Sequence, residues 1–245
     1  MSQAWFRFYE ELNDFLPVSR KKQLFSHAFS GNPSVKDMIE SLGVPHVELD
    51  MVLVNSESVS FSYKVKDADH ISVYPVFESF NISEVQHLRE QPLRDIKFVA
   101  DVHLGRLVKY LRLLGFDTVY EREFSDSEIV NTSVSQKRII LTRDKVLLKN
   151  RKVTHGYWIR SADPHKQIDE VVIRLDLRRH FKPFTRCLEC NGLIINIPKE
   201  EINERLLPKT RKYYNQFQIC PVCRRIYWEG SHFEKMKQFV ESFQF

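Results

Sequence analysis

The chain has 245 residues, which is enough for two domains or for one large domain with an appendage. Hydrophobic residues make up 42%, charged residues 28% and aromatic residues 12%, and these fractions exclude a disordered, collagen-like or disulfide-scaffold protein. The net charge of +5 is unevenly distributed, because residues 1–80 carry a net of −4 and the remaining residues a net of +9. A basic region of this kind suits a polyanionic partner, and equally a plain soluble surface.

Membrane and export signals are not visible in the sequence. No stretch approaches the roughly 20 apolar residues that cross a bilayer, and the first residues have acidic side chains with no cationic lead into an apolar run. We therefore expect a cytoplasmic protein that does not interact with membranes.

The first 80 residues predict a small α+β domain. Short runs such as AWFRFY, QLFSHAF, MVLVN and HISVYPV alternate apolar and polar positions, which is typical of strands. The segment NPSVKDMIESLG instead predicts a helix that is capped by Ser34, carries Asp37 three residues later and ends at Gly43. A mixed sheet crossed by one helix follows from this order.

This order resembles the β-grasp, ubiquitin-like fold, particularly its sulfur-carrier branch. Members of that branch end in a free Gly-Gly whose carboxylate is activated. Here Tyr74-Pro75-Val76-Phe77 continues into further chain, so a sulfur-transfer function has little support.

The sequence pattern changes after residues 81–95, which we predict to be a polar linker. IKFVAD predicts a strand, and HLGRLVKYLRLLGF predicts a helix with a stripe of leucines that ends at Gly115. Further candidate strands and helices then alternate up to about residue 180, in the segments DTVY, SDSEIVNTSVSQ, RIILT, RDKVLLKN, GYWIR and SADPHKQIDEVVIRLDL. This alternation predicts an α/β domain with a parallel sheet over residues 96–180.

The four cysteines form two CxxC pairs separated by 29 residues, namely Cys187 with Cys190 and Cys220 with Cys223. This spacing predicts a tetrahedral zinc site. Closed sites of four cysteines are structural, so we assign the zinc to folding. Residues 181–245 are then a zinc ribbon with a C-terminal helix.

Basic and aromatic residues are interleaved around these cysteines. Phosphate contacts and base stacking on nucleic acid would use both kinds of side chain, although a solvated basic surface over a small aromatic core would look the same. The residues concerned are Arg178, Arg179, Phe181, Lys182, Phe184, Arg186, Lys209, Arg211, Lys212, Tyr213 and Tyr214.

Acidic residues follow the predicted strands of the α/β domain. Asp101 follows IKFVA, Asp126 and Glu128 open the helix after DTVY, and Asp144 follows RIIL. In a parallel sheet these positions lie near the carboxyl edge, where ligands bind. Converging carboxylates there would suit Mg2+ or Mn2+, with a phosphate substrate completing the site.

Each of these carboxylates could instead be a helix cap. Ser125-Asp126-Ser127-Glu128 is a capping-box pattern, and Asp163 before Pro164 has the pattern of an N-cap. Asp101 and Asp144 differ because they share one predicted sheet edge, with cationic side chains nearby that could hold a phosphate. Those candidate substrate residues are Arg106, Arg143 and Lys145.

Taken together, these motifs resemble the Mut-seven C-terminal ribonuclease family. The resemblance covers about residues 95–236 and includes LGRL, LTRD and the paired CxxC motifs. It implies a PIN-like nuclease core with a C-terminal zinc ribbon, fused to a ubiquitin-like domain. It also implies metal-dependent cleavage of RNA by Asp101, Asp144 and a third carboxylate, Asp126 or Glu128.

The resulting prediction is a ribonuclease with a structural Zn2+ and a catalytic Mg2+ or Mn2+. The alternative is an RNA-binding adaptor with a degenerate nuclease core, in which the ubiquitin-like domain recruits a protein partner. Because the acidic domain would repel RNA phosphates, we expect it to serve partner binding or regulation, and its removal to preserve cleavage.

Overall fold

The computed structural model describes residues 1–75 and 96–243. Its contacts divide the chain into two compact units, one formed by residues 1–95 and 125–158 and the other by residues 96–124 and 159–245. The predicted linker, 81–95, lies outside the described residues. Among the helices that are described, none combines the length and the apolar character that a bilayer crossing requires.

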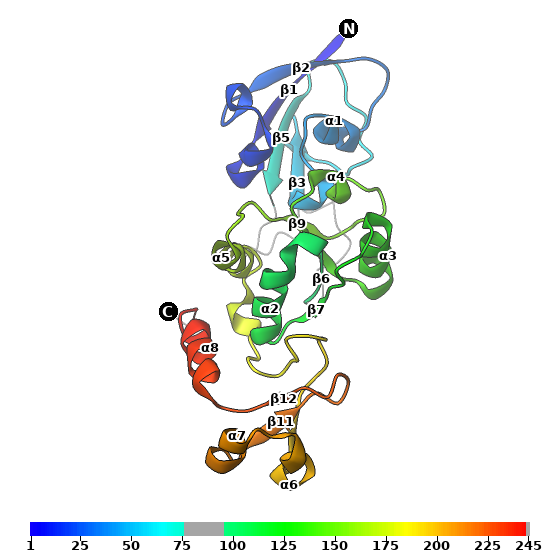
Figure 1. Ribbon diagram of the computed structural model, residues 1–245. Coiled ribbons are helices and arrows are strands. Elements are labelled where there is room, and N and C mark those ends of the chain that lie inside the picture. Colours follow the sequence, from blue (N-terminus) through cyan, green and yellow to red (C-terminus); the bar gives the residue numbers. More distant parts are fainter. Residues whose placement is uncertain (76–95, 244–245) are drawn as a thin grey trace. The chain divides into compact units, whose positions relative to one another are not determined.

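The first unit contains a five-stranded mixed sheet in the order β2-β1-β5-β3-β4 (Figure 1). β1 is antiparallel to β2 and parallel to β5, and β3 is antiparallel to both β4 and β5. The strands are β1 (Ser2–Phe8), β2 (Phe25–Phe29), β3 (Leu49–Val54), β4 (Glu57–Ser58) and β5 (His70–Pro75). The mixed sheet predicted from the alternating pattern is confirmed.

One α-helix, α1 (Val35–Ser41), crosses this sheet as the sequence predicts. Ser34 and Asp37 form a complete capping box, in which each side chain is hydrogen-bonded to the other residue's backbone N–H. Short 3-10 helices, η1 (Glu10–Phe15), η2 (Val18–Arg20) and η3 (His46–Glu48), connect the other elements. The core that results includes Phe6, Leu12, Ile39, Val52 and Ile71, which are at most 1% exposed.

The same unit contains two helices and two strands from later in the chain. These are α3 (Asp126–Gln136), β8 (Ile139–Thr142), α4 (Lys145–Leu148) and β9 (Gly156–Trp158). β8 and β9 pair in parallel, as the α/β pattern predicts.

The region of the five-stranded sheet contacts the α4–β9 segment through hydrogen bonds. His46 in η3 donates from Nε2 to the Val153 carbonyl at 2.8 Å, and Lys149 Nζ donates to the Glu40 carbonyl at 2.9 Å. The carboxylate of Glu48, which is 1% exposed, accepts from the Trp158 backbone N–H at 2.6 Å. Residues 1–75 are therefore packed against the later segment and are not an independent appendage.

Aromatic rings extend this contact. Phe15 at the end of η1 packs on Trp158, with ring centroids 4.8 Å apart. Lys145 Nζ lies 3.9 Å from the Trp158 ring centroid and 4.8 Å from that of Phe15. A desolvated cation over an aromatic face is attracted by the ring quadrupole, so the two rings also hold the first residue of α4.

Substitution of Glu48 by Leu is expected to lower the free energy of unfolding by about 2 kcal/mol, because the Trp158 N–H in a part-buried hydrogen bond loses a charged acceptor. Urea denaturation monitored by tryptophan fluorescence measures the change. Glu57→Leu, at an exposed position on β4, is the matched control and should leave the midpoint in place. Equal midpoints for both variants would contradict this role of Glu48.

The second unit begins with a parallel strand pair, β6 (Lys97–Ala100) and β7 (Asp117–Val119). The predicted helix between them is divided into a 3-10 turn, η4 (Val102–Leu104), and α2 (Gly105–Leu113). Its leucine stripe is buried, with Leu107 and Leu111 fully inaccessible. α2 packs against α5 (Pro164–Arg174), which Asp163 caps through the His165 N–H as the sequence predicts.

A distant part of the chain is hydrogen-bonded to the end of α2. After the 3-10 helix η5 (Leu177–His180), Lys182 and Phe184 donate their backbone N–H groups to the Leu114 and Leu113 carbonyls at 2.9 and 3.0 Å. Gly115 has φ +97°, and a Cβ there would lie 2.1 Å from the Lys182 carbonyl oxygen. Only glycine permits this close approach.

A three-stranded antiparallel sheet in the order β10-β11-β12 follows, with short helices beside it (Figure 1). Ile202, Leu206, Phe217 and Ile219 form its small core. The elements are β10 (Ile195–Ile197), α6 (Lys199–Ile202), η6 (Asn203–Arg205), α7 (Pro208–Tyr213), β11 (Phe217–Ile219) and β12 (Ile226–Tyr227). The last helix, α8 (Ser231–Glu241), stacks Phe239 on Tyr110 of α2, with ring centroids 4.7 Å apart.

Candidate functional site

The four cysteines come together in one cluster in the second unit, and their sulfur atoms lie within 4.8 Å of one another. Two sulfur contacts join the two knuckles, with Cys187 Sγ 3.4 Å from Cys223 Sγ and Cys190 Sγ 3.3 Å from Cys220 Sγ. All four are free thiols. A cluster of four sulfur ligands at this spacing suits a tetrahedral metal ion such as zinc.

The two knuckles have matching backbone hydrogen bonds. The Cys187 N–H donates to Gly192, and the Asn191 N–H donates back to the Cys187 carbonyl, at 2.7 and 3.0 Å. In the second knuckle the Cys220 and Arg224 N–H groups make the corresponding bonds at 2.9 and 2.8 Å. Asn191 and Arg224 both take the left-handed conformation that closes such a turn, with φ of 68° and 61°.

The electrostatics of the cluster favour a cation. Although burial opposes ionisation, hydrogen bonds from the Tyr227 hydroxyl and from backbone N–H groups lower the pKa of Cys187 to about 6. Burial, together with neighbouring thiols, raises the pKa of Cys190 to about 12 and also raises that of Cys223. Four thiolates at this spacing repel one another, so complete ionisation requires a bound metal ion.

Arg112 of α2 supports the first knuckle and was not predicted from the sequence. Its side chain is 3% exposed, and its Nη1 donates to the Leu188 and Glu189 carbonyls at 3.1 and 2.7 Å. Its Nε and Nη2 donate to the Thr118 carbonyl at 3.0 and 2.9 Å. Burial lowers its pKa. A usable signal exists in the sequence, because Arg112 lies four residues after Val108, on the apolar face of the helix.

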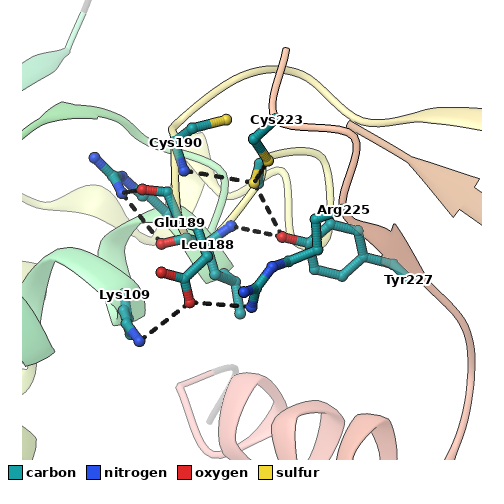
Figure 2. A network of polar contacts seen from close by, with 9 residues as sticks. Lys109, Leu188, Glu189, Cys190, Cys223, Arg225 and Tyr227 are labelled. Atoms are coloured by element: carbon teal, nitrogen blue, oxygen red, sulfur yellow. Dashed lines mark hydrogen bonds and ion pairs between the residues drawn. The ribbon is translucent and has the colours of Figure 1, made fainter. Parts of the chain in front are cut away.

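Glu189, between the two ligands of the first knuckle, joins two other cations (Figure 2). Its Oε1 lies 3.3 Å from Lys109 Nζ of α2 and 3.2 Å from Arg225 Nη1 of the second knuckle. Burial opposes its ionisation, but these cations and Arg112 lower its pKa overall. Both knuckles are thus linked to α2 through one carboxylate.

Substitution of Arg112 by Met is expected to cost about 2 to 3 kcal/mol, because it leaves buried carbonyl oxygens without their charged donor. We also expect roughly 10- to 100-fold weaker zinc binding, as for other groups that orient metal ligands. Competition with a zinc-chelating dye and urea denaturation measure the two effects. Arg122→Met, at an exposed position, is the matched control. Unchanged zinc affinity in Arg112→Met would contradict the supporting role.

The predicted residues of the second unit lie where β6 ends. Asp101 directly follows β6 and is 8% exposed, and its carbonyl accepts from the Leu104 N–H at 2.9 Å. Arg106 is exposed in the first turn of α2. Their placement at the carboxyl end of a parallel strand is the location that ligand sites prefer in such sheets.

The other predicted carboxylates belong to the first unit, and two of them, Glu128 and Asp144, act as helix caps. Glu128 Oε2 accepts from the Ser125 hydroxyl and N–H at 2.6 and 2.8 Å, which completes the predicted capping box and lowers the pKa of Glu128. Asp144 caps α4 by accepting from the Val146 N–H at 2.7 Å. Asp126 is exposed in the first turn of α3. Their convergence with Asp101 on one metal ion stays a prediction.

The two predicted substrate cations beside Asp144 differ in their surroundings. The Arg143 side chain is exposed, while its carbonyl accepts from the Trp158 indole N–H at 3.1 Å. Lys145 is half-buried against Trp158 and Phe15.

Comparison with known proteins gives two matches in chain order. Residues 1–81 match the family model described as Mut7-C ubiquitin. Residues 96–240 match the model described as Mut7-C RNAse domain. No curated protein and no solved structure gave a significant match. The second model covers more than half of the chain, so the protein belongs to the Mut7-C RNAse domain family and carries the family's ubiquitin-like domain at its N-terminal end.

Proposed function

We propose that this protein is a metal-dependent ribonuclease that cleaves RNA phosphodiester bonds. The observation that carries the proposal is the match of residues 96–240 to a family model named for its RNase domain. The parallel strand pairs, with an acidic residue at the end of β6 and another just after β8, support a PIN-like core.

The proposed site contains Asp101, Asp144 and one of Asp126 or Glu128. Carboxylate oxygens suit a hard cation, so these residues would hold Mg2+ or Mn2+, which activates water and neutralises charge on the phosphodiester when bound. The low exposure of Asp101, 8%, would limit competing solvent at one ligand. Arg106 and Arg143, both exposed, and Lys145 would contact the RNA phosphates.

We further propose that residues 181–245 form a zinc ribbon that contributes to RNA binding, and that the protein acts in the cytoplasm. The contacts of Phe15, His46 and Glu48 with the α4–β9 segment support a second role for the ubiquitin-like domain beside the proposed partner binding. It would stabilise the segment that begins at Asp144. We therefore expect its removal to reduce cleavage, whereas the domain's acidic charge alone predicts that cleavage is preserved.

A cleavage assay tests the proposed function. Purified full-length protein is incubated with a mixture of labelled RNAs and Mn2+, Mg2+ or EDTA, and the products are resolved on a denaturing gel. Cleavage that requires the added ion and ceases with EDTA is expected. Absence of turnover with either ion, in protein shown to contain zinc and to be folded, would contradict it.

The capping geometry supports a second candidate, an RNA-binding adaptor with a degenerate nuclease core. Glu128 and Asp144 both accept backbone hydrogen bonds that a helix cap alone explains. An adaptor would bind RNA without turnover in the same assay. Provided that its structural zinc stays bound, it would bind RNA equally well with and without EDTA.

A further inference from the structure

A cavity of about 670 Å³ lies in the second unit, within the roughly 300 to 1,000 Å³ typical of small-ligand sites. Its walls come from the chain around Phe184, from the three-stranded sheet and from the start of α8. Neither the carboxylates predicted for the metal site nor Arg106, Arg143 and Lys145 line it, whereas Phe184 and Arg186, from the basic and aromatic residues around the cysteines, do. It is therefore a separate candidate site.

Aromatic side chains dominate one part of the cavity. The Phe184 and Phe233 rings pack with centroids 4.6 Å apart. Trp228 also lines the cavity and is 39% exposed, so part of this residue is accessible to solvent. Flat aromatic surfaces beside a polar opening suit a planar ligand that stacks, and nucleobases are the common example.

Four of the polar side chains in the lining are neutral carboxamides, and the charged ones are Arg186 and Glu229. Gln218 of β11 donates from Nε2 to Asn196 Oδ1 of β10 at 3.2 Å, and Asn215 and Gln216 lie nearby in the lining. Carboxamides offer a donor and an acceptor together, which is the pattern that base edges present.

The cation in the lining is committed elsewhere. Arg186 donates from Nε to the Gly115 carbonyl at 3.1 Å and from Nη1 to the Asn191 carbonyl at 2.9 Å. Its guanidinium also lies 3.8 Å from Asp117. The cavity thus offers aromatic rings for stacking and carboxamides for base edges. Its guanidinium is already bonded within the protein and is not available for a phosphate.

Cations are available immediately outside the cavity. Lys235 and Lys237 are exposed and flank the lining residue Met236 on α8, whereas Lys199, which follows Pro198, donates from Nζ to Asn215 Oδ1 of the lining at 2.9 Å. Basic groups around a stacking site would contact the phosphates of a strand whose bases enter it.

We propose that this cavity is a subsite for unpaired nucleobases of single-stranded RNA. The identification of the nucleic acid as RNA rests on the proposed function. The subsite would favour single strands, because bases in a duplex have their faces stacked and their edges paired.

The test compares the full-length, zinc-containing protein with Trp228→Ala in fluorescence anisotropy without added Mg2+ or Mn2+. The probes are labelled single-stranded RNAs of about 12 nucleotides and an abasic strand of equal length. We expect the variant to bind the base-bearing RNA roughly tenfold more weakly, and the abasic strand as the wild type does. The salt dependence of binding should keep its slope, since no phosphate contact is removed.

Matched variants sharpen the test. Trp5→Ala removes a tryptophan that is similarly exposed, 37%, on β1 and should leave RNA binding unchanged. Trp228→Phe keeps a stacking face and should restore most of the affinity. If Trp228→Ala fails to fold, Asn196→Asp at an exposed position replaces it, with weaker binding expected.

Two results would overturn the inference: unchanged affinity of Trp228→Ala for base-bearing RNA, or an equal loss on the abasic strand. The Mn2+ cleavage assay separates this from the proposed function. Weakened binding by Trp228→Ala in a protein that never cleaves RNA would support the subsite and remove the nuclease. Mn2+-dependent cleavage by the wild type, with RNA binding unaltered in Trp228→Ala, would support the nuclease and refute the subsite.

Discussion

Removal of zinc is expected to unfold the region from Cys187 to Tyr227 while leaving the mixed sheet of the first unit folded. Four sulfur atoms within 4.8 Å of one another are stable as thiolates only around a cation, and structural zinc sites of this kind contribute about 10 to 16 kcal/mol of apparent binding free energy. Elemental analysis should give one zinc per chain. Hydrogen exchange before and after chelation should show loss of protection at β11 and β12 and little change at β1 and β5.

Two variants of the exposed ligand Cys223 provide the control. Cys223→Ser should lose zinc, whereas Cys223→His should retain it, because three cysteines and one histidine also form closed zinc sites. Protein without stoichiometric zinc, or Cys223→Ser with unchanged exchange at β11, would refute the structural-zinc assignment.

Asp101→Asn and Asp144→Asn are each expected to reduce Mn2+-supported RNA cleavage by more than about 100-fold. Loss of a group that merely orients a metal ligand already lowers metal affinity or activity 10- to 100-fold, and each substitution here removes a charged ligand. The fold of Asp144→Asn should survive, because Asn is as good an N-cap as Asp and can still accept the Val146 N–H. Initial rates with matched circular dichroism spectra measure the effect.

Asp163→Asn is the matched control for the Asp144 variant. Asp163 also caps a helix, through the His165 N–H at 2.8 Å, and is exposed. It should keep both fold and activity. Full activity in Asp144→Asn would mean that this residue only caps α4, and would favour the adaptor if Asp101→Asn behaved in the same way.

Features that depend on neighbouring residues in the sequence were predictable. The capping boxes at Ser34 and Ser125 need residues three apart, and the structure has both. The cysteine cluster follows from two CxxC pairs because each pair closes its own turn. The alternation in the strands and the leucine stripe of α2 likewise predict which side chains are buried, because side chains on one face recur at a fixed spacing in a strand or a helix.

Features that depend on distant pairing were not predictable. Phe15 and Trp158 come from opposite ends of the first unit, and neither run of sequence identifies the other as its partner. The domain's net charge gave no indication that its buried Glu48 accepts from the Trp158 backbone. Asp144 was assigned to a metal from its place after a strand, but the same place makes it a cap, and one sequence position supports both roles.

The bonds of Arg112 also set an order of events during synthesis. Its helix, α2, leaves the ribosome long before the Leu188 and Glu189 carbonyls, which are 76 and 77 residues further along the chain. Until that stretch emerges, Arg112 Nη1 can donate only to water, and the chain around Lys182 is not yet present to pack against Gly115. Closing so long a loop is entropically costly and slow. The first knuckle should therefore gain its high zinc affinity only late in folding, and an excised peptide covering the cysteines, without α2, should bind zinc more weakly than the whole chain.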